Sequence, residues 1–375
     1  MRSCLGILAI AVLFLFFSSM NTTVAQSIAT PTAPSKATGQ IAFASNRTGK
    51  YQIYVINADG SNERQLTNDG ANNGQFGLTW SPDGKHIVYT SDRVAHDFTQ
   101  LFIMDSDGSN SKLLTFDLFS APEDVYPAYS PDGKHLVFER LTRNHWEILS
   151  MNADGTNIKN LTNSQGKDQS PSWSPDGKHI VFESNRDFSE DGLQEIYIMN
   201  SDGSDQERLT NNDAYDGYAG WSPDSKHILF NSSRDGEQEL YTMNIDGSNP
   251  KRLTKGQTNK LVSTWSPDGR YIAFVQQMDI SNSSDTEIFV MNADGTHIQQ
   301  ITFVPGWNGY TRIAWTRFPI RVNPTATPNV TATPTASDTD VPTDTQTATN
   351  TDVPTNTIAP TNTATPTATP TVLPI

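Results

Sequence analysis

The sequence has a single cysteine among its 375 residues. Cys4 lies ahead of an apolar run near the N-terminus, so the rest of the chain has no disulfide, no thiol nucleophile and no cysteine-ligated metal. The apolar periodicity of amphipathic helices is also lacking along the chain. These two absences exclude a disulfide-stabilised scaffold and a helical fold.

Positive charge is scarce as well. The chain has 26 Lys and Arg against 41 Asp and Glu, a formal net charge of −15. A field of that sign repels phosphate backbones, so we expect no nucleic-acid partner.

The N-terminal residues have the composition of an export signal. Arg2 precedes the apolar residues 5–17, and Thr23-Val24-Ala25 follows them. A short basic start, an apolar middle and a small residue before the cut are typical of a secretory signal peptide, here cleaved after Ala25. The run is shorter than the roughly 20 residues of a membrane-spanning helix, although a retained anchor is the alternative. We therefore expect an exported protein, extracellular, cell-surface or periplasmic, that does not span a membrane after cleavage.

The remainder of the chain is built from six copies of one unit. Asp-Gly pairs recur at intervals of 44 to 48 residues, at 59–60, 107–108, 154–155, 202–203, 246–247 and 294–295. An aromatic residue followed by Ser-Pro-Asp begins at Trp80, Tyr129, Trp173, Trp221 and Trp265, and Trp315 takes the sixth such place. A fixed period of this length indicates a repeat architecture.

Each unit predicts four short strands, named a to d in chain order. In the second unit they cover residues 77–81, 86–91, 100–105 and 112–115, which are rich in β-branched and aromatic residues and are separated by Pro-Asp-Gly and Ser-Asp-Gly turns. Four strands per unit are typical of a β-propeller blade. The chain begins with strands b, c and d (41–46, 51–57, 64–67) and ends with an isolated strand a (311–316). We predict an all-β, six-bladed propeller in which these pieces form one blade and close the ring.

The predicted organisation has four parts: a signal peptide at 1–25, a short linker at 26–39, the propeller at 40–318 and a tail at 319–375. Residues 324–375 contain 19 Thr and 9 Pro, a composition that buries no core and predicts disorder. The tail is either an O-glycosylated stalk or a passive spacer.

The repeat resembles a known family. WSPDGKHIVF-x-S-N-R followed by EIYIMNSDGS-x-x-x-R-L-T is similar to the WD40-like (PD40) repeat of the TolB propeller family. The resemblance implies the fold, whereas TolB itself is a periplasmic protein with an extra N-terminal α/β domain that works with outer-membrane lipoproteins. We expect no counterpart of that domain in the short segment between the cleavage site and the first strand. The propeller also resembles those attached to prolyl-oligopeptidase-type enzymes, so the fold does not decide the role.

The two faces of the predicted ring differ. The a–b and c–d turns share one face and are nearly the same in every unit, which we call the constant face. The b–c and d–a loops share the other, the variable face, and they differ in length, as in residues 47–51, 186–194 and 278–286. Variable loops on a rigid scaffold are where recognition usually occurs.

Two positions recur on the variable face. The strand-a set stands five residues before each strand-a aromatic and comprises Gln75, Asp124, Asp168, Asp216, Lys260 and Tyr310. The strand-b set stands four residues after each strand-b aromatic and comprises Arg47, Arg93, Thr142, Arg186, Arg234 and Met278. Since strand a is innermost, we expect acidic charge at the channel mouth beside Arg donors, suited to a basic peptide, an amine or a cation. The alternative is that each Arg pairs with a neighbouring Asp or backbone carbonyl and only ties blades together.

Tryptophan supplies a second kind of candidate. The strand-a aromatics recur once per unit, which favours packing between blades over a platform for sugars. Trp146 and Trp307 break this register and are expected to be exposed contacts on the variable face.

Catalytic chemistry finds little support. No G-x-S-x-G pentapeptide occurs, which argues against a serine hydrolase. Four histidines recur at one position on the constant face, one per unit and therefore too far apart to share a zinc ion: His86, His135, His179 and His227. Pectate-degrading lyases that share this repeat use a metal at the channel mouth, where the aligned positions here lack His. Asp124, Asp168 and Asp216 are weak candidates for a bound cation. We expect no cofactor.

The sequence therefore predicts a non-catalytic, monomeric, secreted propeller that binds a protein or peptide through its variable face. A propeller that binds carbohydrate or cell wall is one alternative, and a metal-dependent polysaccharide lyase or hydrolase is the other.

Overall fold

The computed structural model describes residues 37–95, 98–115, 123–142, 145–187, 193–279, 281–303 and 313–316. The chain divides into two units, Met1–Ala326 and Thr327–Ile375, and the described residues all belong to the first. The predicted signal peptide, most of the linker and the tail lie outside them. No described helix is long and apolar enough to cross a bilayer.

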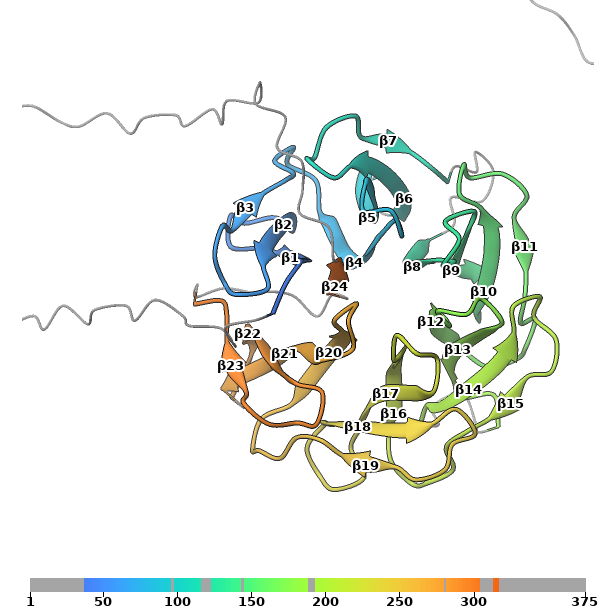
Figure 1. Ribbon diagram of the computed structural model, residues 1–375. Coiled ribbons are helices and arrows are strands. Elements are labelled where there is room, and N and C mark those ends of the chain that lie inside the picture. The colour runs from blue at the N-terminus through green and yellow to red at the C-terminus, as the bar shows by residue number, and fades with distance from the viewer. Residues whose placement is uncertain are drawn as a thin grey trace, which may run out of the picture. The chain divides into compact units, whose positions relative to one another are not determined.

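The described residues form a six-bladed β-propeller of four-stranded antiparallel sheets, which confirms the predicted fold. In Figure 1 the a strands surround the centre and the short d strands lie at the rim. The first blade joins both ends of the fold, because β24 (Ala314–Thr316) pairs with β1 (Gln40–Ser45), which continues into β2 (Gln52–Asn57) and β3 (Arg64–Gln65).

The other five blades follow in chain order. The second and third comprise β4 (Asn73–Trp80), β5 (His86–Ala95), β6 (Phe98–Asp105), β7 (Lys112–Leu113), β8 (Asp124–Tyr129), β9 (His135–Thr142), β10 (His145–Asn152) and β11 (Lys159–Asn160). The fourth and fifth comprise β12 (Asp168–Trp173), β13 (His179–Ser184), β14 (Glu195–Asn200), β15 (Glu207–Arg208), β16 (Asp216–Trp221), β17 (His227–Ser232), β18 (Glu239–Asn244) and β19 (Lys251–Arg252). The sixth comprises β20 (Lys260–Trp265), β21 (Tyr271–Asp279), β22 (Asn282–Asn292) and β23 (Gln299–Gln300).

The b strands are buried along almost their whole length. β13 (HIVFES) and β17 (HILFNS) leave only their first residue partly or fully exposed. Each blade packs between two others, so side chains on both faces of these strands lie in apolar contacts. That arrangement explains why the b strands read as continuous apolar runs rather than as an alternation of apolar and polar residues.

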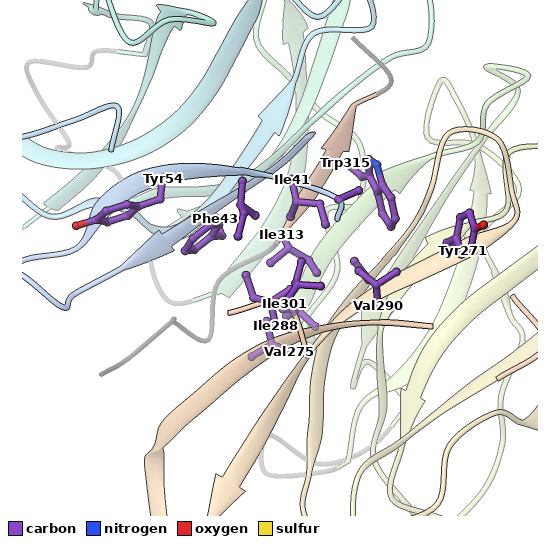
Figure 2. Packing of buried hydrophobic residues seen from close by; sticks show 14 of the residues in the cluster. Ile41, Phe43, Tyr54, Tyr271, Val275, Ile288, Val290, Ile301, Ile313 and Trp315 are labelled. Atoms are coloured by element: carbon purple, nitrogen blue, oxygen red, sulfur yellow. The ribbon is translucent and has the colours of Figure 1, made fainter. Parts of the chain in front are cut away.

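One apolar cluster fills each junction between neighbouring blades. The largest joins the first and last blades, and Figure 2 shows Ile41 and Phe43 of β1 close to Val275 and Ile288 of β21 and β22. Trp315 of β24 is in the same cluster and is 8% exposed, and its indole N–H donates to Thr38 O at 3.0 Å. The closure of the ring therefore has a packed core of its own.

The constant-face turns are held by their own side chains. In the third blade, Ser130 Oγ donates to Asp132 Oδ1 at 2.7 Å, and the same Oδ1 accepts the Lys134 backbone N–H at 3.0 Å. Gly133 completes the turn with a φ of 70°, which glycine adopts at little cost. These bonds are internal to the turn, so its recurrence reflects folding rather than recognition.

Each described strand a from the second blade to the sixth carries an irregularity near its start. In the third, fourth and fifth blades one extra residue lies between the first pairs of the ladder and the rest. The extra residue has a left-handed backbone in each case: Tyr126 (φ 50°), Ser170 (φ 53°) and Tyr218 (φ 51°). A bulge of this kind bends the strand and redirects its side chains, here at the variable-face end of the channel.

Candidate functional site

The arginines of the strand-b set stack on aromatic rings of their own blades. The guanidinium carbons lie between 4.5 and 5.1 Å from the centroid of a strand-c ring in four blades, for Arg47, Arg93, Arg186 and Arg234. A cation over a ring face is attracted by the ring quadrupole. The stacking fixes these side chains in place and turns them along the blade.

Two aspartates of the strand-a set lie at the ends of these arginines. Arg186 Nη2 is 2.7 Å from Asp168 Oδ1, and Arg234 Nη2 is 2.9 Å from Asp216 Oδ2. Both aspartates are 0% exposed. Each pair lies within one blade, whereas the alternative interpretation of the Arg set expected pairs that tie blades together. The two aspartates add no carboxylate to the surface of the channel mouth.

The third blade makes the same tie with a residue that sequence spacing missed. Arg140, two positions before Thr142, holds the buried Asp124 by two bonds, Nε to Oδ1 at 2.6 Å and Nη2 to Oδ2 at 2.8 Å. The register places Arg140 opposite Asp124, where the next blade has Ser184 opposite Asp168. Residues two apart lie on the same face of a strand. The sequence could therefore have indicated Arg140 in place of Thr142.

In the second blade, Asn73 occupies the predicted place of Gln75. Asn73 pairs with Ser91 in the ladder, and Arg93 Nη2 donates to Asn73 Oδ1 at 3.0 Å. Counting five residues back from Trp80 is wrong here, because β4 holds two more residues between its ladder pairs than the strands at Asp168 and Asp216. Gln75 is partly exposed.

In the sixth blade the strand-a position carries a positive charge, because Lys260 stands where three other blades have Asp. Lys260 is 3% exposed, and its Nζ lies 2.7 Å from Thr258 O and 3.5 Å from Glu239 Oε2 of the preceding blade. Met278 stands where other blades have Arg and is 38% exposed. This blade therefore replaces an internal ion pair by a pair across the blade junction.

The remaining predicted residues fall at the edge of the described structure or beyond it. Arg47 pairs with Glu63, the residue directly before β3, and its Nε–H donates to Ser45 Oγ at 2.9 Å. Trp146 is partly exposed and pairs with Leu141 across the β9–β10 hairpin. Trp307 and Tyr310 lie outside the described residues.

The constant-face end of the channel is lined by the strand-a aromatics. A cavity of about 240 Å³ there is bordered by all six strands a, and Trp80, Trp221 and Trp315 around it are only 7–8% exposed. Trp221 Nε1 donates to Ser172 O of the preceding blade at 3.0 Å, and Trp80 Nε1 donates to Ala314 O at 3.2 Å. These indoles connect neighbouring blades, which supports packing rather than a platform for sugars.

The variable-face end holds a different cavity, which we call the mouth pocket. Its volume is about 300 Å³, and its lining residues come from four consecutive blades: Tyr126, Gln169, Ser170, Glu183, Gln194, Tyr215, Tyr218, Gln238, Leu261 and Val262. Tyr218 and Val262 also border the cavity at the constant-face end, so both cavities belong to one channel. No described member of the strand-a or strand-b sets lines the mouth pocket.

Two of the lining residues interact at the junction of the fourth and fifth blades. The Tyr215 hydroxyl donates to Glu183 Oε2 at 2.9 Å, and Glu183 is 3% exposed. Burial and the neighbouring carboxylate raise the pKa of Tyr215 well above 10, so its hydroxyl stays protonated and remains a donor. Sequence reasoning missed this pocket because the repeat positions that line it carry different residue types: Tyr126, Ser170, Tyr218 and Val262 each stand three residues before a strand-a aromatic.

The mouth pocket has a fixed backbone. Tyr126, Ser170 and Tyr218, three of its lining residues, are the left-handed residues of the strand-a bulges. Such conformations are costly for residues other than glycine and cluster at binding sites, where the surrounding structure holds them. The bulges thus deliver two tyrosines and a serine to one cavity.

A buried Gln or Glu also recurs in the c strands. Gln or Glu stands at this position in every blade and is at most 5% exposed: Gln52, Gln100, Glu147, Glu195, Glu239 and Glu287. Threonines of the d–a segments donate to three of them, as Thr162 Oγ1 does to Glu147 Oε2 at 2.6 Å. These carboxylates anchor the loops that lead into strand a.

Glu287 should make the stability of the fold depend on pH. Burial raises its pKa from 4.5 to about 7, against the opposing effects of Thr302 and Arg47. Because the folded state then binds the proton more tightly than the unfolded state, the free energy of unfolding falls as pH rises from about 4.5 to 7. Replacing Glu287 by Gln should flatten this part of the profile, measured by urea unfolding at several pH values. Identical profiles for the two proteins would contradict the assignment.

The described residues contain no cluster of three or more His, Cys, Asp or Glu side chains that could hold a metal ion. The repeated histidines His86, His135, His179 and His227 begin the b strands, at the constant face.

The chain belongs to the family of the TolB β-propeller domain. The model of that family, PD40, matches residues 16–123, 118–189 and 187–283, more than half of the chain. A crystal structure of TolB from Acinetobacter baumannii is similar at a TM-score of 0.62 with 22% sequence identity, over 74% of this chain and 66% of that one. At this identity the likeness shows the fold.

Other similar proteins include an uncharacterised protein and an enzyme. An uncharacterised protein of Agrobacterium fabrum is 30% identical over 116 residues, which are 31% of this chain and 37% of that protein. An oligogalacturonate lyase in complex with manganese has a TM-score of 0.50 with 15% identity, over 69% of this chain and 73% of that one. The chain spans about a third of the curated relative and just under two thirds of the TolB structure.

Proposed function

We propose that this chain is an exported, non-catalytic propeller that binds a protein or peptide in the mouth pocket on its variable face. The observation that carries the proposal is the lining of that pocket, where three tyrosines, three glutamines and one carboxylate surround about 300 Å³ at the end of the channel. Aromatic walls with a few placed polar groups are typical of binding pockets, and tyrosine adds contact area at low entropic cost.

Export is supported by the sequence alone. The apolar run at 5–17 and Thr23-Val24-Ala25 have the order of a cleaved signal peptide.

A chain with a single early cysteine and no disulfide depends on its apolar junctions for stability, and the six clusters supply them.

The residues present do not favour a metal-dependent lyase step. The oligogalacturonate lyase structure holds manganese, but the part of the mouth pocket that the structure describes is lined by a single acidic residue and no histidine. Glu183 is engaged with Tyr215 there. We therefore derive no reaction for this site.

The proposal is tested by affinity capture with residues 26–375 as bait, against the medium and envelope of the producing cell. Replacing Tyr218 and Gln238 together by Ala removes one ring and one amide from the mouth pocket. Tyr218 is partly buried and packs against the cluster between the first and last blades, so the melting temperature of this variant checks that the fold is retained. We expect a protein or peptide that the native bait retains to be lost by this variant.

The matched control replaces Lys134 by Ala, an exposed residue of a constant-face turn whose side chain pairs only with Asp132. It should capture the same partner as the native bait. A partner retained equally by all three baits would refute the assignment of the site, and recovery of polysaccharide alone would favour the carbohydrate alternative.

A further inference from the structure

The charge of the mouth pocket indicates what enters it. Among the described residues, its lining contains one acidic residue, Glu183, and no Lys, Arg or His. We propose that the mouth pocket takes a positively charged group of the partner, a lysine ammonium or an arginine guanidinium, which pairs with Glu183. This inference rests on the proposed function and names the chemistry of its ligand.

Glu183 is held in one orientation at the pocket wall. Its ladder partner in β12 is Gln169, and its Oε2 accepts the Tyr215 hydroxyl at 2.9 Å. Gly217 packs against the same oxygen, and a Cβ at that position would lie 2.0 Å from Oε2. A glycine there leaves room for the carboxylate, which is thereby fixed before a ligand arrives.

The equivalent residue of the preceding blade shows a different use. Glu139 occupies the same position of its strand b, is fully buried, and accepts the Ser170 backbone N–H. It does not line the mouth pocket, whereas Glu183 does. Glu183 therefore forms part of the cavity wall, and the Tyr215 hydroxyl is one of its partners.

The other walls suit a long cationic side chain. Tyr215 and Tyr218 lie with ring centroids 6.3 Å apart at an interplanar angle of 60°, and Tyr126 borders the same cavity. Aromatic faces attract ammonium and guanidinium groups. Leu261 and Val262 form an apolar wall, which fits the methylene stem that lysine and arginine bury.

The volume of the mouth pocket and the negative net charge of the chain favour a single cationic side chain as the ligand. A volume of about 300 Å³ is at the lower limit of ligand pockets, which admits one side chain or a small amine rather than a folded segment. The net charge of −15 attracts positively charged partners before they make contact.

The test uses four capped tripeptides, Gly-Xaa-Gly with Xaa as Lys, Arg, norleucine or Glu, titrated into residues 26–375 at low ionic strength and followed by NMR. The Lys and Arg peptides should bind, the norleucine and Glu peptides should not, and added salt should weaken the binding. Glu183→Gln should lower the affinity for the Lys and Arg peptides by roughly tenfold or more, because it removes one partner of a desolvated charge pair.

Glu183→Gln keeps an oxygen that accepts the Tyr215 hydroxyl, and its melting temperature checks that the fold is retained. Glu207→Gln, an exposed change at the rim, is the control and should bind as the native chain does. Equal binding of the norleucine and Lys peptides, or unchanged binding by Glu183→Gln, would overturn the inference.

The failures of the two proposals are distinguishable. If the Tyr218 and Gln238 variant loses its captured partner while the tripeptides show no preference for charge, the binding site stands and the cationic ligand does not. If the Lys peptide binds through Glu183 while capture is indifferent to the pocket variant, the pocket holds a cation and the partner binds elsewhere.

Discussion

Replacing Asp168 by Asn should lower the free energy of unfolding by about 3–5 kcal/mol. Asp168 is 0% exposed and accepts three bonds, from Ser164 Oγ at 2.8 Å, Ser184 Oγ at 2.6 Å and Arg186 Nη2 at 2.7 Å. An amide offers one acceptor oxygen in place of two and turns an N–H group toward a donor. It also leaves the Arg186 guanidinium without its counter-charge. Urea unfolding followed by circular dichroism measures the effect.

A second variant separates the ion pair from general damage to the blade. The sixth blade has Met278 at the place of Arg186, so the fold accepts an uncharged side chain there. Adding Arg186→Met to Asp168→Asn should therefore recover part of the lost stability, because the uncompensated charge is removed as well. Glu207→Gln at the exposed rim should change stability by less than about 0.5 kcal/mol. Strictly additive effects of the two core changes would contradict the role given to this pair.

Ending the chain after residue 312 should abolish the single cooperative unfolding transition, whereas ending it after residue 326 should not. The shorter chain loses β24, which pairs with β1 through Gln40–Thr316, Ile41–Trp315 and Ala42–Ala314. It also removes Ile313 and Trp315 from the cluster shown in Figure 2. An open edge at β1 then invites pairing between chains. We expect concentration-dependent association of the shorter chain in sedimentation experiments.

Trp315→Ala gives the graded form of the same prediction. The side chain is 8% exposed and its indole donates to Thr38 O, so its removal leaves a cavity and an unpaired acceptor. The expected loss is about 3–5 kcal/mol. If the chain ending at residue 312 unfolds as the longer one does, the ring is not closed by β24.

The fold was predictable because its signals are local and repeated. The Ser-Pro-Asp-Gly turn is held by bonds within four or five residues, so its sequence alone predicts it. The incomplete blade at the start and the isolated strand at the end likewise predicted the closure that β24 makes. The b–c hairpin of the second blade runs further than predicted, with β5 reaching Ala95 and β6 beginning at Phe98, because pairing continues past the apolar core.

The site was less predictable because burial depends on the other blades. The strand-a set was expected at the surface of the mouth, but Asp124, Asp168 and Asp216 are each 0% exposed. An Arg four residues after the strand-b aromatic can be a donor at the surface or a buried partner of these aspartates, and its position in the sequence is the same in both cases. A count of residues also fails where a bulge changes length, as it did for Gln75 and Asn73.

The mouth pocket is lined from repeat positions whose residue type changes from blade to blade. Tyr126 and Tyr218 reach it through bulges with a left-handed backbone, and Tyr215 reaches it from the preceding loop. Gln194 and Gln238 come from the last residues of two b–c loops. A pocket assembled from four blades depends on their packing, which a single repeat does not encode.

The most direct test of the proposed binding face is site-specific photo-cross-linking. A benzophenone amino acid replaces Gln238 in the mouth pocket in one protein, and Lys134 on the constant face in another. After illumination with the native medium and envelope fraction, the Gln238 position should give a discrete protein or peptide adduct, and the Lys134 position should give none. An adduct at Lys134, or none at Gln238 while the native bait captures a partner, would contradict binding at the channel mouth.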